Sequence, residues 1–288
     1  MIRVVKVAGL ATVQDQGRPG WMHRGLPPGG ALVPEALARA NRAAGNAPGA
    51  ACVELIGAIA LANEARADVA IGVDDGRVIV IEPGESARIA SDGGRPRYVA
   101  PRGGIDVPVA WGGRGTLLVA RLGGHEGRAL RRGDGLAIAD DVEGAEARAL
   151  DAEPPREPAP PIRVIAGPDR DRFEPGAIDA LLGAAYRVSP SSDRVGARLE
   201  GPSLRLARGA AARPSRSSPM VRGAIEVPPS GAPIVLGPDH PTTGGYPVIA
   251  VVVRADAGAV YATGIGGSVR FALAAAPQRS EGRLQFDR

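Results

Sequence analysis

Lysine is almost absent from this sequence. The chain has 288 residues and 35 basic side chains, and its one lysine is Lys6. A phosphate-binding P-loop requires Gly-Lys-Ser or Gly-Lys-Thr, but Lys6 lies in Val-Val-Lys-Val-Ala with no glycine loop before it. The Met-Lys-Met hairpin of a biotin carrier is also missing. Any ATP or biotin chemistry in which this chain takes part must therefore be supplied by another chain.

Cysteine and histidine are also scarce. A single cysteine, Cys52, excludes an intrachain disulfide and a cysteine-rich zinc site, and its small apolar neighbours predict a buried core position. Three histidines, His23, His125 and His240, lie in separate segments and have no metal-type partner two or four residues away. We therefore expect no metal site.

Aromatic residues and long apolar runs are few as well. Aromatics make up 3% of the chain, and arginines are scattered among acidic residues, with a net charge of +4. A nucleic-acid platform normally needs stacking aromatics and a basic stripe, so none is expected. Runs such as Val248–Val253 are too short to cross a bilayer, and no basic-then-apolar leader opens the chain. We expect a cytoplasmic protein that binds no membrane.

Glycine and proline are abundant, with 41 and 27 residues. So many helix-breaking residues argue against a helix bundle. Short Val- and Ile-rich stretches bounded by Gly, Pro and Asp are instead typical of a β-barrel or β-sandwich. The sequence therefore predicts a mainly β fold with few helices. The predicted strands are Ile2–Val7, Val69–Val73, Arg77–Ile81, Thr116–Ala120, Ile162–Ala166, Ile234–Leu236, Val248–Val253 and Ser268–Leu273.

Two helices are predicted between these strands. The first has Pro34 in its first turn and Gly45 as a left-handed stop. The second lies near Ala177–Tyr186, where apolar residues recur at helical spacing. The glycines of Gly264–Gly267 fit a hairpin turn better than a dinucleotide-binding loop.

A proline-rich segment divides the chain. Asp151–Pro161 has five prolines in eleven residues, a composition that favours an extended linker and cannot enter a sheet. It predicts a β-rich domain at 1–150 and a second at 162–288. A weaker segment, Gly209–Pro219, is interpreted as an exposed loop.

Four polar loops punctuated by glycine carry the candidate chemistry. Tight turns alone explain much of this pattern, because Asp, Ser and Thr cap turns and Gly supplies positive φ. The loops are Gln14–Pro27, Gly103–Pro108 with Gly112–Thr116, Ser189–Pro202 and Asp239–Pro247.

A functional interpretation of these loops assigns two kinds of role. Forked guanidinium donors can hold a carboxylate or a carboxyphosphate-like group, and a Thr-Thr-Gly-Gly segment can expose backbone N–H groups as an anion nest. The substrate-binding candidates are Arg18, Arg114, Arg194, Thr242, Thr243, Gly244, Gly245 and Tyr246. The catalytic candidates are Asp15, His23 and Asp193, with His240 a further acid–base group.

Together the loops resemble the family of allophanate hydrolase subunit 2 and the C subunit of 5-oxoprolinase, which also includes biotin-dependent carboxyltransferases and antagonists of a kinase inhibitor. The resemblance covers nearly the whole chain. Its motifs are Thr12-Val13-Gln14-Asp15, Gly17-Arg18-Pro19-Gly20, Gly103-Gly104-Ile105-Asp106-Val107-Pro108, Ser192-Asp193-Arg194, Arg198-Leu199-Glu200-Gly201-Pro202 and Thr242-Thr243-Gly244-Gly245-Tyr246-Pro247.

The resemblance implies two β-barrel-like domains of the cyclophilin-like type. It also implies partners, the B subunit of the same complex and with it the A subunit, which together hydrolyse 5-oxoproline to glutamate with ATP. No cofactor would be bound by this chain alone, because ATP would enter through the partner subunits. On this interpretation, we expect Arg194→Ala to abolish turnover with little loss of fold.

Two alternatives remain open. One is carboxyl transfer from carboxybiotin to a urea-like amide, and the other is non-catalytic regulation of a kinase inhibitor that resembles the B subunit. Departures from the family pattern motivate the second: Gly29–Val33 lacks the usual Ser and Asp, Gly112–Thr116 has lost two hydroxyls, and Pro241 replaces a Gln. Such losses remove hydrogen bonds that a polar substrate needs.

Overall fold

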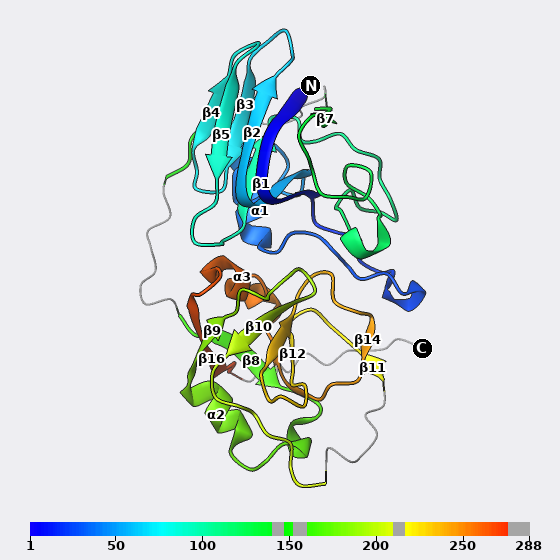
Figure 1. Ribbon diagram of the computed structural model, residues 1–288, viewed down its shortest axis with the longest axis vertical. Helices are drawn as coiled ribbons and strands as arrows, with labels where there is room; N and C mark the ends of the chain where they lie inside the picture. The colour runs from blue at the N-terminus through cyan, green and yellow to red at the C-terminus, as the bar shows by residue number, and fades with distance from the viewer. Residues whose placement is uncertain (140–146, 152–159, 210–216, 276–288) are drawn as a thin grey trace, which may run out of the picture.

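Each half of the chain is built around one β-sheet. The computed structural model describes residues 1–139, 147–151, 160–209 and 217–275. We call residues 1–139 the N-terminal half and residues 160–275 the barrel half. The two halves stack along the long axis of the molecule, with the N-terminal half above the barrel in Figure 1. The predicted mainly β fold with few helices is confirmed.

The N-terminal half contains a seven-stranded sheet of order β4-β3-β6-β2-β1-β7, with β5 paired to β2. Its strands are β1 (Ile2–Gln14), β2 (Cys52–Asn63), β3 (Val69–Val73), β4 (Val78–Ile81), β5 (Ser86–Ala90), β6 (Arg97–Pro101) and β7 (Gly135–Leu136). β1 and β2 pair antiparallel from end to end. Cys52 is a free, fully buried core residue, as predicted, and burial raises the pKa of its thiol.

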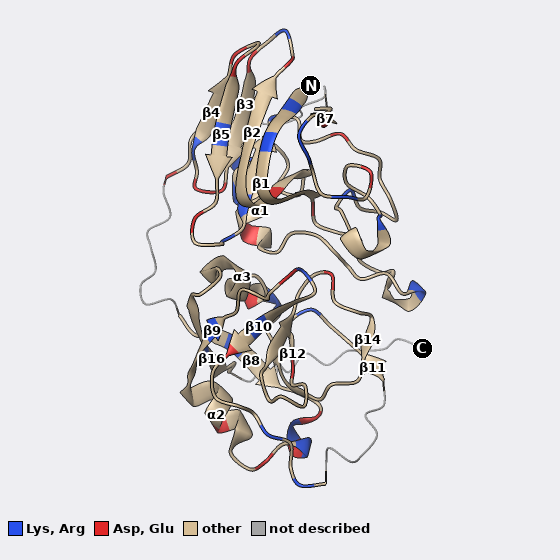
Figure 2. Cartoon of the chain, in the orientation of Figure 1, with Lys and Arg blue, Asp and Glu red and all other residues tan. Residues whose placement is uncertain are grey.

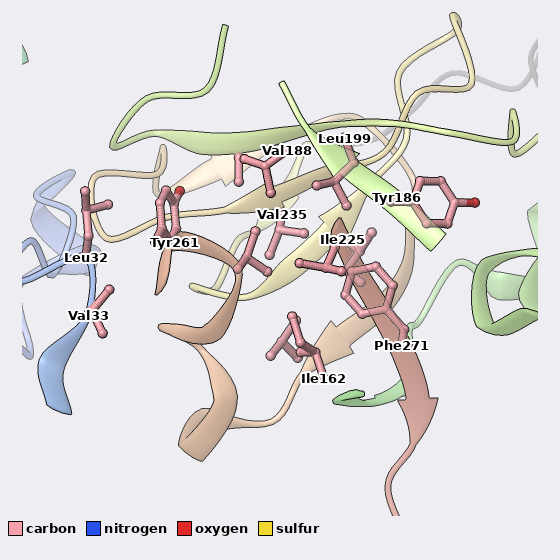
Figure 3. Packing of buried hydrophobic residues seen from close by; sticks show 14 of the residues in the cluster. Leu32, Val33, Ile162, Tyr186, Val188, Leu199, Ile225, Val235, Tyr261 and Phe271 are labelled. Atoms are coloured by element: carbon pink, nitrogen blue, oxygen red, sulfur yellow. The ribbon is translucent and has the colours of Figure 1, made fainter. Parts of the chain in front are cut away.

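The barrel half closes on itself in the order β10-β13-β12-β15-β8-β16-β9. Its strands are β8 (Ile162–Ala166), β9 (Ala185–Val188), β10 (Gly196–Glu200), β12 (Ala224–Glu226), β13 (Ile234–Leu236), β15 (Val248–Val252) and β16 (Ser268–Leu273). Closure leaves no edge of this barrel unpaired. Ile225, Val235 and Phe271 fill the interior (Figure 3). A separate two-stranded ribbon joins β11 (Ser218–Pro219) to β14 (Thr243–Gly244).

Three α-helices occur in the described residues: α1 (Pro34–Ala44), α2 (Ala177–Gly183) and α3 (Ala259–Thr263). α1 starts at Pro34 and stops at Gly45, whose φ is 77°, as predicted. It packs on β3 and β6, and at Gly72 it approaches so closely that a Cβ would lie 2.2 Å from the Ala40 carbonyl oxygen. None of these helices is long and apolar enough to span a membrane.

The second helix is shorter than predicted. Apolar spacing continues through Tyr186, but α2 ends at Gly183, and Ala184 is already extended with ψ 161°. The reason is tertiary: β9 must pair with both β10 and β16 to close the barrel, so Tyr186 enters a strand and is buried there.

Two other local predictions were wrong. Thr116–Ala120 is not a strand, because the chain folds back through a bridge between Leu117 and Leu122 and turns as the 3-10 helix η2 (Leu118–Ala120). Gly264–Gly267 is not a hairpin turn, since it joins helix α3 to strand β16.

The two predicted irregular segments are described only in part. The linker prediction falls mostly on residues 152–159, outside the described residues. Of the predicted exposed loop, residues 210–216 also lie outside them, while Ser218 and Pro219 pair with β14.

One apolar cluster joins the two halves. It contains Leu32, Val33 and Tyr98 from the N-terminal half together with Ile249 and Tyr261 from the barrel half. Figure 3 shows Leu32 and Val33 beside Tyr261. Basic and acidic positions are interspersed over both halves (Figure 2). The contact between the halves is thus a continuation of the hydrophobic core.

Candidate functional site

Residues from the polar loops meet where the two halves join. Asp15 and Arg18 follow β1, Arg194 precedes β10, and Asp239 and His240 follow β13. All five side chains are buried. Residues far apart in the sequence thus form one polar cluster beside the apolar core, which we call the junction cluster.

Arg194 lies at the centre of this cluster. Its Nε and Nη2 donate to the carboxylate of Asp239 at 2.8 and 3.0 Å, and Nη1 donates to Glu54 at 2.5 Å. Nη2 also donates to the carbonyl oxygen of Gly30 at 2.7 Å. Burial alone would lower the pKa of Arg194, but the two carboxylates outweigh it and raise the pKa, so the guanidinium stays charged. Arg194 therefore ties the barrel to the N-terminal half.

Glu54 is the partner that the sequence interpretation missed. Its Oε2 accepts hydrogen bonds from the Tyr98 hydroxyl and the Leu32 backbone N–H, both at 2.7 Å. The signal available was one acidic residue inside the apolar stretch that forms β2. A buried charge of this kind requires a buried partner of opposite charge, which here comes from the other half of the chain.

Asp15 holds two loops together. Its Oδ1 accepts from the backbone N–H groups of Gly17 at 2.7 Å and Gly115 at 3.0 Å, and Oδ2 accepts from that of Arg114 at 2.5 Å. The carboxylate predicted as an acid–base group is thus engaged by three backbone donors. Its observed role is to fix the first and second polar loops against each other.

Arg18 is fully buried and retains one free donor. Nε donates to the Ala110 carbonyl oxygen at 3.3 Å and Nη2 to that of Gly115, while Nη1 has no partner among the described residues. A Cβ at Gly29 would lie 3.1 Å from Nη1 and 3.9 Å from Asp239 Oδ1. Glycine at that position therefore allows the backbone to approach the buried guanidinium closely, because a Cβ there would crowd Nη1.

His240 is also fully buried, and only one of its two ring nitrogens has a hydrogen-bond partner among the described residues. Its Nδ1 lies 2.8 Å from the Pro241 carbonyl oxygen, which fixes the proton on Nδ1, and Nε2 has no partner among the residues described. Burial lowers the pKa of His240, so the ring is neutral and Nε2 carries a free lone pair.

A cleft of about 290 Å³ opens beside the junction cluster. Its walls are chiefly apolar. The charged residues that line it are Asp193, Arg194 and Asp239. The apolar walls come from both halves and include Leu10, Leu32, Ile56, Val119, Val188 and Ile265. A mostly apolar cleft with a few convergent polar groups is typical of a small-molecule site.

The side chains of three predicted residues are not part of the junction cluster, although Asp193 lines the cleft beside it. Arg114 donates from Nη1 to Asp106 at 3.1 Å and to the Val107 carbonyl oxygen. His23 is exposed and stacks on Trp21, with ring centroids 6.1 Å apart. The exposed side chain of Asp193 accepts from two backbone N–H groups of its own turn. The structure therefore gives none of the three a shared site with Arg18.

The later residues of the Thr242–Tyr246 segment line a different cavity. Thr243 and Gly244 form β14, and Tyr246 is largely exposed. Gly244, Gly245 and Tyr246 border a cavity of about 820 Å³ on the barrel half. In the described ranges, no three His, Cys, Asp or Glu side chains gather in a way that could hold a metal ion.

Comparison with known proteins identifies relatives over nearly the whole chain. The model of a family described as carboxyltransferase domain, subdomain A and B, matches residues 24–273. The C subunit of the Escherichia coli 5-oxoprolinase is 29% identical over 89% of this chain and 86% of its own length. That of Haemophilus influenzae is 30% identical over 94% and 90%. The urea amidolyase of Lachancea kluyveri is 28% identical over 93% of this chain but only 16% of its own length.

Solved structures share the fold. The urea amidolyase of K. lactis superposes with a TM-score of 0.81 at 25% identity, covering 94% of this chain and 18% of that chain. The protein TTHA0988 superposes with a TM-score of 0.79 at 27% identity, and this chain spans 55% of its length. With a family model that matches 24–273, the chain belongs to the carboxyltransferase domain family of subdomains A and B.

Proposed function

We propose that this chain is the component equivalent to the 5-oxoprolinase C subunit in an ATP-dependent assembly that hydrolyses the cyclic amide 5-oxoproline to glutamate. The observation that carries the proposal is the extent of the match. It covers 86% of the E. coli C subunit, against 16% of the urea amidolyase of L. kluyveri. The chain thus corresponds to most of the C subunit but to a small part of the amidolyase. Partners of the A and B types would complete the assembly.

The cyclic amide of 5-oxoproline is unreactive and must be activated before water can hydrolyse it. Hydrolysis adds the oxygen of water to the lactam carbonyl carbon, breaks the C–N bond and leaves a proton on the nitrogen. A lactam is a poor electrophile, so ATP, entering through the partner subunits, would activate it. The developing anion then requires fixed donors, which act strongly in a water-poor site. The unpartnered Nη1 of Arg18, which lies close to Gly29, is such a donor.

The contacts of the candidate residues support a different division of the proposed proton-transfer roles. Asp15 is engaged by three backbone N–H groups and acts as a positioning residue. The free Nε2 of neutral His240 carries an uncommitted lone pair, so it can accept a hydrogen bond from a substrate group at the junction. Arg194 serves as a structural tie, since both carboxylates around it are already paired.

The test is reconstitution of the assembly. The chain is co-expressed with the A- and B-type homologues of its host, and ATP-dependent glutamate release from 5-oxoproline is measured. We expect turnover in the wild type and its loss in Arg18→Gln, with Arg114→Gln as the matched control because Arg114 is partly exposed and lies in the same loop cluster. Undiminished glutamate release by Arg18→Gln would overturn the role of Arg18, and an inactive wild-type assembly would overturn the function.

A second candidate function is carboxyl transfer from carboxybiotin to a urea-like amide. It is favoured by the superposition on the urea amidolyase of K. lactis, with a TM-score of 0.81. A tagged pull-down from the host distinguishes the two functions. Recovery of a streptavidin-reactive chain supports carboxyl transfer, recovery of both A- and B-type partners supports lactam hydrolysis, and a B-type partner alone supports a regulatory binding role.

A further inference from the structure

The two tryptophans of the chain meet at its surface. Trp21 precedes the 3-10 helix η1 (Met22–Arg24), and Trp111 lies in a distant loop, yet their ring centroids are 4.8 Å apart at an interplanar angle of 82°. Trp111 is 47% exposed, and Val109 in the same loop is 59% exposed. We call Trp21, Trp111 and Val109 the tryptophan patch. Exposed apolar patches mark interaction sites, and tryptophan is enriched at the energetic centres of protein interfaces.

The backbone of Trp111 is strained. Its φ is 56°, in the left-handed region, where a bulky side chain is rare because its Cβ crowds the following carbonyl oxygen. The ring is half-exposed, so burial in the core does not account for this conformation. Strain of this kind persists where a function depends on the position of the residue. A contact made outside the chain would supply that function.

The tryptophan patch is built on the loops that hold Arg18. The Nε of Arg18 donates to the carbonyl oxygen of Ala110, the residue before Trp111, at 3.3 Å. The same two loops touch again at Gly113, where a Cβ would lie 2.6 Å from the Gly17 carbonyl oxygen. In Figure 1 the blue turn of η1 stands out from the side of the molecule. A protein seated on the patch would therefore lie beside the junction cluster.

The charged residues of these loops define the chemistry of a partner. Arg24, in η1, and Arg121, directly after η2, are exposed, and neither forms an ion pair with any residue that the structure describes. The acids of the same loops, Asp106 and Glu126, are already paired with other arginines. The loops thus present an apolar centre together with uncompensated positive charge. A complementary partner has an apolar pocket edged by acidic side chains.

We infer that the tryptophan patch is the docking surface for the B-type partner, which inserts the Trp111 ring into an apolar pocket edged by acidic side chains. This chain spans 55% of TTHA0988, so in that protein the same fold is continuous with further polypeptide. The inference rests on the proposed function and deepens it. ATP that enters through the partner subunits must reach Arg18, and a partner docked on the loops that hold Arg18 brings it there.

Calorimetric titration of the whole chain with the purified B-type homologue of its host tests the inference. We expect Trp111→Gly to weaken binding at least ten-fold while its thermal midpoint does not fall, because glycine relieves the strain. The matched control Val80→Ser changes a valine that is 56% exposed on β4, across the N-terminal half from η1 in Figure 1, and should stay within two-fold. Wild-type affinity in Trp111→Gly, or no binding by the wild type, overturns the inference.

Two further measurements test the place and the charge of the contact. In the chain labelled with 5-fluorotryptophan, both fluorine NMR signals should shift or broaden when the unlabelled partner is added, because both tryptophans lie in the patch. Unchanged signals in a complex that forms would place the contact elsewhere and overturn the inference. Arg24→Glu and Arg121→Glu should each weaken binding several-fold at low salt, and equal or tighter binding by both variants would contradict the acidic edge.

Other outcomes separate this inference from its rivals and from the proposed function. Analytical ultracentrifugation of the chain alone should show a monomer, and a dimer that Trp111→Gly dissociates would assign the patch to a second copy and overturn the inference. If the assembly releases glutamate and Trp111→Gly changes neither partner affinity nor turnover, the inference fails and the function stands. If the partner binds through Trp111 but the assembly is inactive, the inference stands and the function fails.

Discussion

At the scale of single residues, burial decides which charged groups hold the fold and which can meet a ligand. Arg194 and Arg18 were both predicted as anion holders, and both are buried. Arg194 is saturated by Glu54 and Asp239, whereas Arg18 keeps Nη1 without a partner among the described residues. The sequence interpretation could not separate them, because Glu54, one of the two acids that pair with Arg194, lies 140 residues away.

The expectation that Arg194→Ala would leave the fold intact is revised accordingly. Removing the guanidinium leaves two buried carboxylates unpaired, which typically costs about 3–5 kcal/mol. We expect the free energy of unfolding in urea to fall by that amount. Arg114→Ala, at a partly exposed site, is the control and should cost about 1 kcal/mol or less. Equal losses in the two variants would contradict the structural role of Arg194.

His240 gives the fold a specific pH dependence. Burial lowers the pKa of His240 from the ordinary value of 6.5. Below about pH 6.5, His240 binds a proton in the unfolded chain, whereas burial excludes this proton in the folded chain. The free energy of unfolding therefore falls as the pH falls. The largest slope for one proton is about 1.4 kcal/mol per pH unit. Urea denaturation at pH 7, 6 and 5 should show a shallower decline for His240→Gln, and the same slope in both proteins would refute this.

At the scale of elements, local signals were sufficient where a helix or strand has its own start and stop. The bounds of α1 follow from Pro34 and Gly45, and β3 matches its predicted range Val69–Val73. Prediction failed where the partner strand decides the conformation. β9 carries a helix-like spacing but is held extended by β10 and β16.

Gly45 and Gly183, each at the end of a helix, should respond in opposite ways to substitution by alanine. Gly45 has φ 77°, a conformation that costs an L-residue about 1–2 kcal/mol, so Gly45→Ala should destabilise the protein by that amount. Gly183, the last residue of α2, has open space where a Cβ would lie. Gly183→Ala should therefore be neutral or stabilise the protein by about 0.5–1 kcal/mol. Thermal denaturation of both variants measures the difference, and a common sign would contradict it.

The short 3-10 helix η4 (Arg254–Asp256) is attached to β8 by an ion pair. Asp256 accepts from Arg163 at 2.7 and 2.9 Å, and these hydrogen bonds hold the pKa of the Asp256 carboxyl below its ordinary value of 3.8. A carboxyl with a lowered pKa stabilises the fold above the unfolded pKa, and this contribution is lost as the pH falls through the folded pKa.

Asp256→Asn should therefore be less stable than the wild type at pH 7, with a difference that shrinks below about pH 4. Denaturation in urea across this range measures it. The control Asp171→Asn removes a highly exposed carboxylate and should have little effect at any pH. A constant difference between Asp256→Asn and the wild type down to about pH 2 would exclude this linkage.

At the scale of the whole molecule, one apolar cluster crosses the junction between the two halves, while the sheet of the N-terminal half also has a core of its own. The apolar cluster that includes Leu32 and Val33 continues into the barrel through Tyr261. A segment that loses this packing exposes apolar surface on both sides of the junction. The halves are therefore expected to unfold together.

Two optical signals test this cooperativity. Both tryptophans, Trp21 and Trp111, lie in the N-terminal half, so their fluorescence reports that half, while far-ultraviolet circular dichroism reports the whole chain. We expect coincident transitions in urea for the wild type. Leu32→Ala should lower the free energy of unfolding obtained from each signal by about 2–5 kcal/mol, because Leu32 is almost fully buried. Separate midpoints in the wild type would show that the halves unfold independently.

Some properties follow from the sequence alone. The density of Gly and Pro and the short Val- and Ile-rich stretches determined a mainly β protein, because these residues restrict the backbone locally. The same local chemistry determined α1, the buried Cys52 and the family resemblance carried by the ordered loops. These features depend on neighbours in the sequence.

The tertiary structure alone decided which polar groups meet. It paired Arg194 with Glu54 across the junction, divided the loops between two cavities, and left Arg18 Nη1 and His240 Nε2 without hydrogen-bond partners among the described residues. The physical reason is that the energy of a buried charge depends on groups brought near it by folding. The spacing of residues along the sequence does not determine those distances.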